Sequence, residues 1–171
     1  MNTNDIMRFA VGMAGFSRLP DDSRIYHPAD PVRRILFGID IAESDILSAK
    51  ERGFDLVIAH HPPDAEVILS VLSRHVELML ASGVNKERAD SAYETLRNIL
   101  AEQYRNKSSD KPAERLAEVA RTHGIGFMNI HLPCDELGRH TLQTVADMAG
   151  ADRPLSALVH LQRPRSTRRS S

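Results

Sequence analysis

Three short apolar runs in the chain have the character of buried β-strands. The runs are continuous rather than alternating, which is typical of strands covered on both faces of a parallel sheet. About a dozen residues in helical rhythm separate the first two runs, which is the length of a parallel crossover and too long for a hairpin. The predicted strands cover residues 34–41, 55–59 and 125–130.

Segments with apolar residues at helical spacing lie around and between these runs. Several of them are followed by a glycine, the residue that commonly ends a helix, at Gly53, Gly83, Gly124 and Gly150. The segment 17–31 is rich in Asp, Ser and Pro and is expected to be a loop. The predicted helices cover residues 4–16, 42–52, 66–81, 86–103, 112–123 and 140–149.

This order of elements predicts an α/β fold, layered, with a mostly parallel sheet and helices on both faces. A chain of 171 residues suits one core. We therefore expect a single α/β domain over residues 1–160. Residues 161–171 hold four arginines and no acidic residue, and we expect them to form a basic, disordered tail.

Charge and composition narrow the classes of partner that the chain is expected to bind. Without the arginine-rich tail the chain has 18 basic and 23 acidic residues, and such an acidic body argues against nucleic-acid binding. No apolar run approaches the roughly 20 residues that span a bilayer, so no membrane partner is expected. Because Cys134 is the only cysteine and no signal peptide is indicated, the cytoplasm is the predicted location.

Side chains that bind metals follow each predicted strand. Asp40 ends the first strand, His60 and His61 end the second, and His131 follows the third, with Asp135 four residues later. The carboxyl ends of parallel strands meet at one edge of a sheet, where ligands bind. Imidazole and carboxylate are ligands of divalent metals, so this edge is a candidate metal site. Ordinary capping or packing of strand-end histidines is the alternative.

The adjacent histidines pose a geometric question, because neighbouring residues on a strand point to opposite faces. Pro62 and Pro63 end the strand at this point, which lets His60 and His61 reach one site. Alternatively, the two histidines serve two neighbouring ions. In that case Asp135 is the natural bridging carboxylate.

Two segments carry a family resemblance. Arg34-Ile-Leu-Phe-Gly-Ile-Asp40, followed by a strand that ends in His60-His61-Pro62, and the later His131-Leu-Pro-Cys-Asp135, resemble the first half of the NGG-one-interacting-factor-three-like family. Its members are often described as type 2 GTP cyclohydrolase I. The resemblance covers residues 5–150, so the fold is expected to be truncated relative to the family.

The resemblance implies a dinuclear metal centre. His60 and His61 would each bind a different divalent ion, and Asp135 would bridge the two; zinc, manganese and iron are the candidate metals. His131 would lie beside the centre as a weaker ligand, or as a catalytic residue that orients groups or relays a proton. The resemblance also implies a homo-oligomer, a toroidal hexamer with its metal centres facing the interior.

Two functions remain open on these grounds. The first is a metal-dependent hydrolase, in which metal-activated water attacks a small-molecule substrate of unknown identity. Its GTP cyclohydrolase assignment rests on the resemblance alone, since no guanine-reading residue is evident. The second is a non-catalytic metal-binding scaffold or interaction protein with an incomplete second metal site. It is favoured because the family's later His-x-x-x-Glu pair is not matched at His160, where Pro164 stands four residues on.

Overall fold

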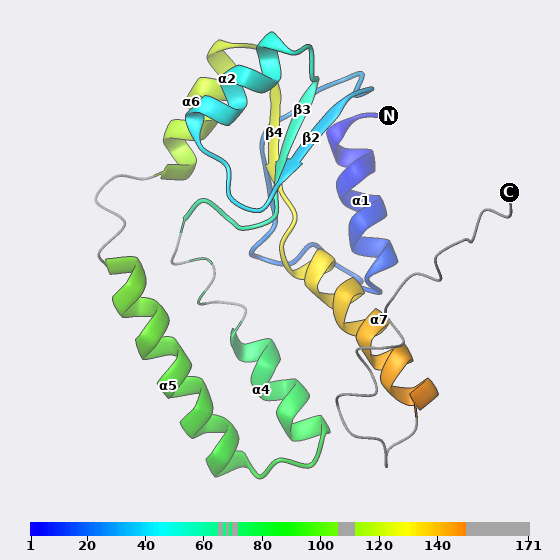
Figure 1. Cartoon of the computed structure of the whole chain (residues 1–171), viewed down its shortest axis with the longest axis vertical. Helices are drawn as coiled ribbons and strands as arrows, with labels where there is room; N and C mark the ends of the chain where they lie inside the picture. The colour runs from blue at the N-terminus through cyan, green and yellow to red at the C-terminus, as the bar shows by residue number, and fades with distance from the viewer. Residues whose placement is uncertain (65–66, 68, 70–71, 106–111, 150–171) are drawn as a thin grey trace, which may run out of the picture. The chain divides into compact units, whose positions relative to one another are not determined.

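The computed structural model describes residues 1–64, 67, 69, 72–105 and 112–149 (Figure 1). The chain divides into two compact units, Met1–Cys134 and Asp135–Ser171, and each is described by itself. The predicted tail, residues 161–171, lies outside the described residues. The single domain expected over residues 1–160 therefore stays a prediction.

The first unit is built on a sheet of four strands in the order β1-β4-β3-β2. Strand β3 (Leu56–Ala59) pairs in parallel with β2 (Ile35–Gly38) on one side and with β4 (Gly126–Asn129) on the other. Strand β1 (Arg24–His27) pairs with β4 in the antiparallel sense at one edge. The prediction of a mostly parallel sheet is confirmed.

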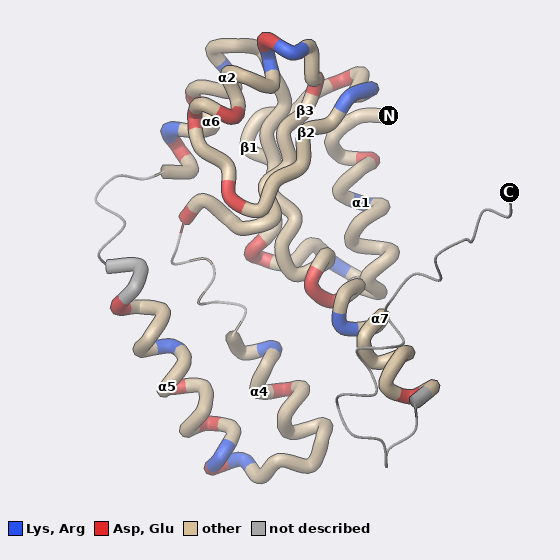
Figure 2. The backbone as a smooth tube through the Cα atoms, in the orientation of Figure 1, with Lys and Arg blue, Asp and Glu red and all other residues tan. Residues whose placement is uncertain are grey.

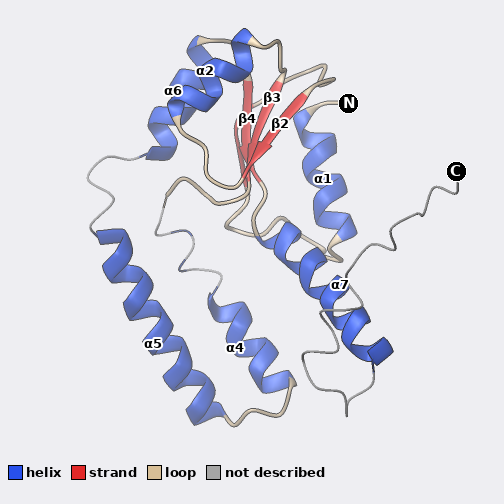
Figure 3. Cartoon of the chain, in the orientation of Figure 1, coloured by secondary structure: helices blue, strands red, loops and turns tan. Residues whose placement is uncertain are grey.

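Helices cover both faces of this sheet, as predicted. Helices α2 (Glu43–Glu51) and α6 (Pro112–Thr122) pack on one face, and α1 (Thr3–Met13) packs on the other (Figure 3). The alternating side chains of β3 and β4 divide between two cores, which explains why their sequences are apolar without alternation. The first core contains Val57, Ala59, Phe127, Ile46 and Ala120, and the second contains Leu56, Ile58, Met128, Ile130 and Met7.

Two further helices of the first unit form an antiparallel pair (Figure 1). Helix α4 (Leu72–Ala81) packs against α5 (Lys86–Arg105), and acidic and basic residues are mixed along α5 (Figure 2). The predicted helix over 66–81 is confirmed from Leu72 onwards. Part of its beginning, residues 66, 68 and 70–71, lies outside the described residues.

Two elements differ from the sequence predictions. Strand β1 lies within the segment expected to be a loop, because its short run pairs with β4 over the register Arg24↔Asn129. Helix α7 (Leu132–Ala149) begins at Leu132 rather than at residue 140. The reason is that the side chain of Asp22 accepts a hydrogen bond from the Leu132 amide and satisfies an N–H group at the helix start.

The predicted helix ends at Gly53 and Gly124 are confirmed. Both glycines have a positive φ, 73° and 59°, in the left-handed region that side chains rarely adopt. Gly53 closely follows α2, and Gly124 lies between α6 and β4. Gly150 lies outside the described residues.

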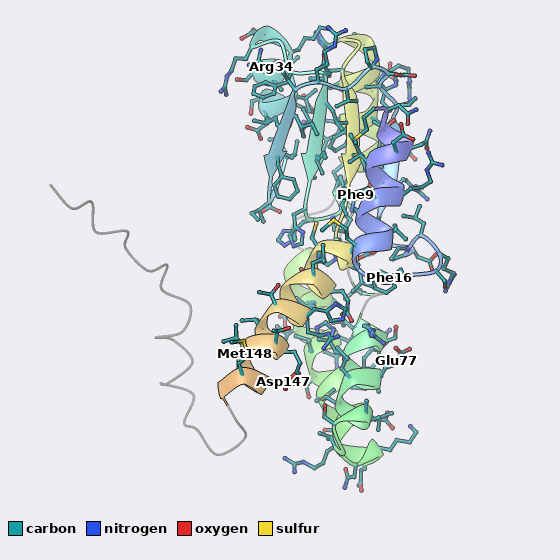
Figure 4. The ribbon with its side chains drawn as sticks, turned by 90° about the vertical axis from the view of Figure 1, so that its right-hand side faces the viewer. Phe9, Phe16, Arg34, Glu77, Asp147 and Met148 are labelled. Atoms are coloured by element: carbon teal, nitrogen blue, oxygen red, sulfur yellow. The ribbon has the colours of Figure 1, made fainter. Side chains whose placement is uncertain are left out.

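The amino-terminal end of the sheet is held by charged side chains. Arg34, labelled in Figure 4, stacks its guanidinium over the ring of Phe54 at 4.7 Å from the centroid. Its amide and that of Arg33 donate to one carboxylate oxygen of Asp55, both at 2.8 Å.

Within the described residues, no helix combines the length and the apolar character needed to cross a bilayer.

Candidate metal centre

The adjacent histidines follow β3 without leaving its hydrogen-bonding partner. The His60 amide donates to the carbonyl of Gly38 at 2.8 Å, and the His61 amide donates to the carbonyl of Ile39 at 2.9 Å. The backbone of His60 and His61 therefore stays hydrogen-bonded to the end of β2 and the residue after it, although β3 itself ends at Ala59. Both imidazoles are held at the carboxyl edge of the parallel strands, as the sequence predicts.

His131 reaches the same edge from β4. The Ile130 amide donates to the carbonyl of Ala59 at 3.0 Å, which continues the pairing of β4 with β3. The carbonyl of His131 then accepts a hydrogen bond from the Cys134 amide at 2.9 Å, in the first turn of α7. His131 thus lies at the junction of a buried strand and a helix.

The three imidazoles form a cluster. One ligand atom from each of His60, His61 and His131 lies within 4.8 Å of the other two. The ring centroids are 5.0 Å apart for His60 and His61, 4.9 Å for His60 and His131, and 5.7 Å for His61 and His131. His131 is buried and the other two are half-buried. The predicted convergence of these three residues is confirmed.

Each ring uses its Nδ1 nitrogen toward an oxygen of the protein. His60 contacts the carbonyl of Ile130 at 3.3 Å, and His61 contacts Oδ1 of Asp40 at 2.9 Å. His131 contacts Oδ2 of Asp22 at 2.7 Å. Histidines that bind metals commonly donate their second nitrogen to such acceptors, which leaves Nε2 as the metal-binding nitrogen. The donor set therefore fits a divalent transition metal.

Asp22 is a site residue that sequence reasoning misses. Its side chain is completely buried, and it touches His131 across 109 positions of the chain. In the sequence Asp22 stands beside Asp21 in a polar segment, and nothing there separates a buried carboxylate from an exposed one. Asp40, by contrast, is predicted at this edge by its position at the end of the first strand.

Asn129 ties the edge strand to the cluster. It is completely buried, and its Nδ2 donates to the carbonyl of Asp22 at 2.6 Å. Its Oδ1 accepts hydrogen bonds from the Arg24 amide and the Tyr26 hydroxyl, both at 3.1 Å. Burial raises the pKa of Tyr26 above its ordinary value, so this hydroxyl keeps its proton and donates.

The other residues of the His131-Leu-Pro-Cys-Asp135 motif are not part of the three-imidazole cluster. Asp135 is exposed in the first turn of α7 and belongs to the second unit. Its bridging role therefore stays a prediction. Cys134, also in this motif, is half-buried and packs against the core of α1, β3 and β4, in the manner of a small apolar side chain.

Comparison with known proteins identifies the family. No protein-family model matches the chain, and no curated protein matches it. Among solved structures, the chain is similar to the crystal structure of a NIF3 superfamily protein from Sphaerobacter thermophilus, with 32% sequence identity and a TM-score of 0.79. The match covers 94% of this chain and 59% of that one.

These figures show that the chain belongs to the NIF3-like family, as the two histidine motifs predict. The chain spans 59% of the length of the solved relative. The mixed α/β fold, with its central sheet and flanking helices, is the part that the two proteins share.

Proposed function

We propose that this chain binds a divalent transition metal ion through His60, His61 and His131. The observation that carries the proposal is the cluster itself, in which three imidazoles from two strand ends come within 4.8 Å of one another. Each ring already has an oxygen partner at Nδ1. This is the pattern that orients imidazole ligands in metal sites.

The chemistry of the donors favours some metals over others. Imidazole nitrogen suits zinc, copper, iron and nickel, whereas magnesium, calcium and manganese prefer oxygen ligands. The group in the described part of the chain consists of three imidazoles. Zinc and iron are therefore better candidates than manganese among the three metals that the family resemblance implies.

We extend the proposal to metal-dependent hydrolysis of a small molecule. Three protein nitrogens leave coordination positions open, as in catalytic rather than structural zinc sites. A divalent ion held here would acidify a bound water and polarise a substrate oxygen. The protein's part is to hold the three rings. His60 is held by a backbone carbonyl, and His61 and His131 by Asp40 and Asp22.

Several finer expectations belong to the proposal. In this arrangement His131 acts as a third ligand, and its role as a proton relay stays a prediction. A second ion bridged by Asp135, GTP as substrate, assembly into a hexamer and location in the cytoplasm are likewise expectations drawn from the resemblance and the sequence.

Elemental analysis of the purified chain tests the metal site. Wild type is expected to carry zinc or iron, His60→Ala and His131→Ala to lose most of it, and His123→Ala to keep it. His123 is exposed at the end of α6, which makes it a matched control. A wild-type chain that takes up no metal, or a His60→Ala variant that keeps it, contradicts the proposal.

Turnover separates the enzyme from the scaffold. The metal-loaded chain would be assayed on GTP and on simple esters and phosphoesters, beside the His60→Ala variant. Metal-dependent turnover that the variant loses supports the hydrolase. A fully loaded but inert protein supports the metal-binding scaffold instead.

A further inference from the structure

A buried polar network precedes β1 and ends on His131. Asp22 and Ser23 have relative exposures of 1% and 3%. Burying a carboxylate is costly unless hydrogen bonds satisfy its oxygens. Among the described residues, the partners of the Asp22 carboxylate belong to Ser23 or to the junction of β4 and α7. The carboxylate is therefore part of the construction around His131.

The hydrogen bonds of Asp22 favour one tautomer of the His131 imidazole. Oδ2 accepts from the Leu132 amide at 2.9 Å and lies 2.7 Å from Nδ1 of His131. The Ser23 hydroxyl accepts from the His131 amide at 3.1 Å and donates to Oδ1 at 3.2 Å. Both carboxylate oxygens thus act as acceptors, so Nδ1 of His131 is the donor in this contact; in the neutral ring, Nε2 then carries the lone pair.

The edge strand holds this carboxylate in place. Asn129, within β4, donates to the carbonyl of Asp22 at 2.6 Å and accepts from the Arg24 amide at 3.1 Å. Asn129, which pairs with Arg24 of β1, is therefore also bonded to the backbone of Asp22. The pairing of β1 with β4 and the orientation of the His131 ring are thus linked through hydrogen bonds of Asn129 and Asp22.

The three histidines differ in how firmly they are held. Nδ1 of His60 faces a backbone carbonyl, which no side-chain substitution removes. The partner of His61, Asp40, is 84% exposed, so water competes for its oxygens. The partner of His131 is fully buried. Of these two carboxylate partners, Asp22 is therefore the one whose hydrogen bonds are shielded from water.

We infer that Asp22, assisted by Ser23, is the positioning residue of the metal site. It fixes the ring orientation of His131 and favours the tautomer with its proton on Nδ1, so that Nε2 is the nitrogen that would bind the ion. This inference rests on the proposed metal binding. The pairing of β1 with β4 then serves to place Asp22, which lies just before β1, beside His131.

The test compares Asp22→Asn with Asp21→Asn, because Asp21 is the exposed neighbour in the same turn. Zinc affinity would be measured by competition with a chelating dye. Loss of a residue that orients an imidazole ligand typically weakens metal binding roughly 10- to 100-fold, and we expect this for Asp22→Asn. Asp21→Asn should stay within about twofold of wild type, as exposed substitutions do.

A second readout uses the metal-free chain, in which the tautomer of each imidazole is read from long-range nitrogen–proton correlations. His131 should be in the Nδ1–H form in wild type and in Asp21→Asn. It should become a mixture of tautomers in Asp22→Asn. Ser23→Ala removes the hydroxyl between Oδ1 and the His131 amide but leaves the carboxylate in place, so it should keep the Nδ1–H form and lower zinc affinity by loosening the ring. It carries the affinity test if Asp22→Asn does not fold.

The two proposals fail in distinguishable ways. A wild-type chain without zinc affinity overturns the proposed function. Wild-type affinity together with an unchanged tautomer in Asp22→Asn overturns only the positioning role of Asp22.

Discussion

Nδ1 of His131 lies 2.7 Å from Oδ2 of Asp22, although 109 positions separate the two residues. The contact joins the segment before the edge strand to the start of α7. The same carboxylate oxygen accepts the Leu132 amide and so satisfies a donor at the helix terminus. One buried side chain therefore completes a helix start and orients an imidazole of the candidate metal centre.

Replacing Asn129 with alanine should destabilise the first unit. The substitution removes three hydrogen bonds and leaves the Asp22 carbonyl, the Arg24 amide and the Tyr26 hydroxyl without this partner inside the protein. We expect a loss of about 2–5 kcal/mol in the free energy of unfolding, because buried polar groups without partners are costly. Urea unfolding followed by circular dichroism measures it.

Asn98→Ala is the matched control, since Asn98 is exposed on α5. It should change the free energy of unfolding by no more than about 0.5 kcal/mol. Equal effects of the two substitutions would contradict the role given to Asn129.

Gly126 should tolerate no side chain, although its backbone conformation is ordinary. A Cβ atom there would lie 2.7 Å from the Cβ of Ala29 and 2.9 Å from Cδ1 of Leu56. Gly126→Ala is expected to lower the free energy of unfolding by about 1–3 kcal/mol, because neighbouring atoms must shift. Thermal unfolding would be compared with that of Gly12→Ala.

Gly12 provides the contrast because it lies in α1, where a Cβ atom added to it would have no neighbour within 4 Å. Alanine is a better helix former there, so Gly12→Ala should stabilise by up to about 1 kcal/mol. A Gly126→Ala variant as stable as wild type would show that the packing between β4 and its neighbours leaves room for a methyl group.

The fall in the free energy of unfolding at acid pH should depend on Asp55. Hydrogen bonds from the amides of Arg34 and Arg33 lower the pKa of this carboxyl below its ordinary value near 3.8. A carboxyl with a depressed pKa in the folded state stabilises the fold above its unfolded pKa and loses that contribution as pH falls through the folded value. Stability should therefore decline below about pH 4.

Asp55→Asn should remove this part of the acid dependence, since the amide does not titrate. Unfolding by urea at a series of pH values between neutral and strongly acidic would show a flatter profile for the variant than for wild type. Asp21→Asn, at an exposed carboxylate, is the control. Parallel profiles for Asp55→Asn and wild type would count against this account.

The parts of the fold that depend on local pattern could be predicted from the sequence. Strands β3 and β4 are buried on both faces, so their apolar runs are continuous and easily distinguished. Helices α2 and α6 end close to Gly53 and Gly124, which take the left-handed conformation. Strand β1 could not be predicted, because its four residues become a strand only through pairing with β4, about a hundred positions later.

The residues of the candidate site likewise fall into those that could be predicted from the sequence and those that could not. His60, His61, His131 and Asp40 could be predicted because each follows a strand, and the carboxyl ends of parallel strands share an edge. Asp22 could not, because its burial is set by a contact 109 positions away and leaves no trace in local sequence. The start of α7 is missed for the same reason, since Asp22 caps it from a distant segment.

Cobalt substitution tests most directly whether three imidazoles surround one cation. Cobalt(II) would be titrated into the metal-free chain, and the visible absorption that reports nitrogen coordination would be followed. We expect wild type and His123→Ala to develop the bands and saturate, and His60→Ala, His61→Ala and His131→Ala each to bind far more weakly with altered bands. Bands in His131→Ala identical to those of wild type, or no bands in wild type, would contradict the account.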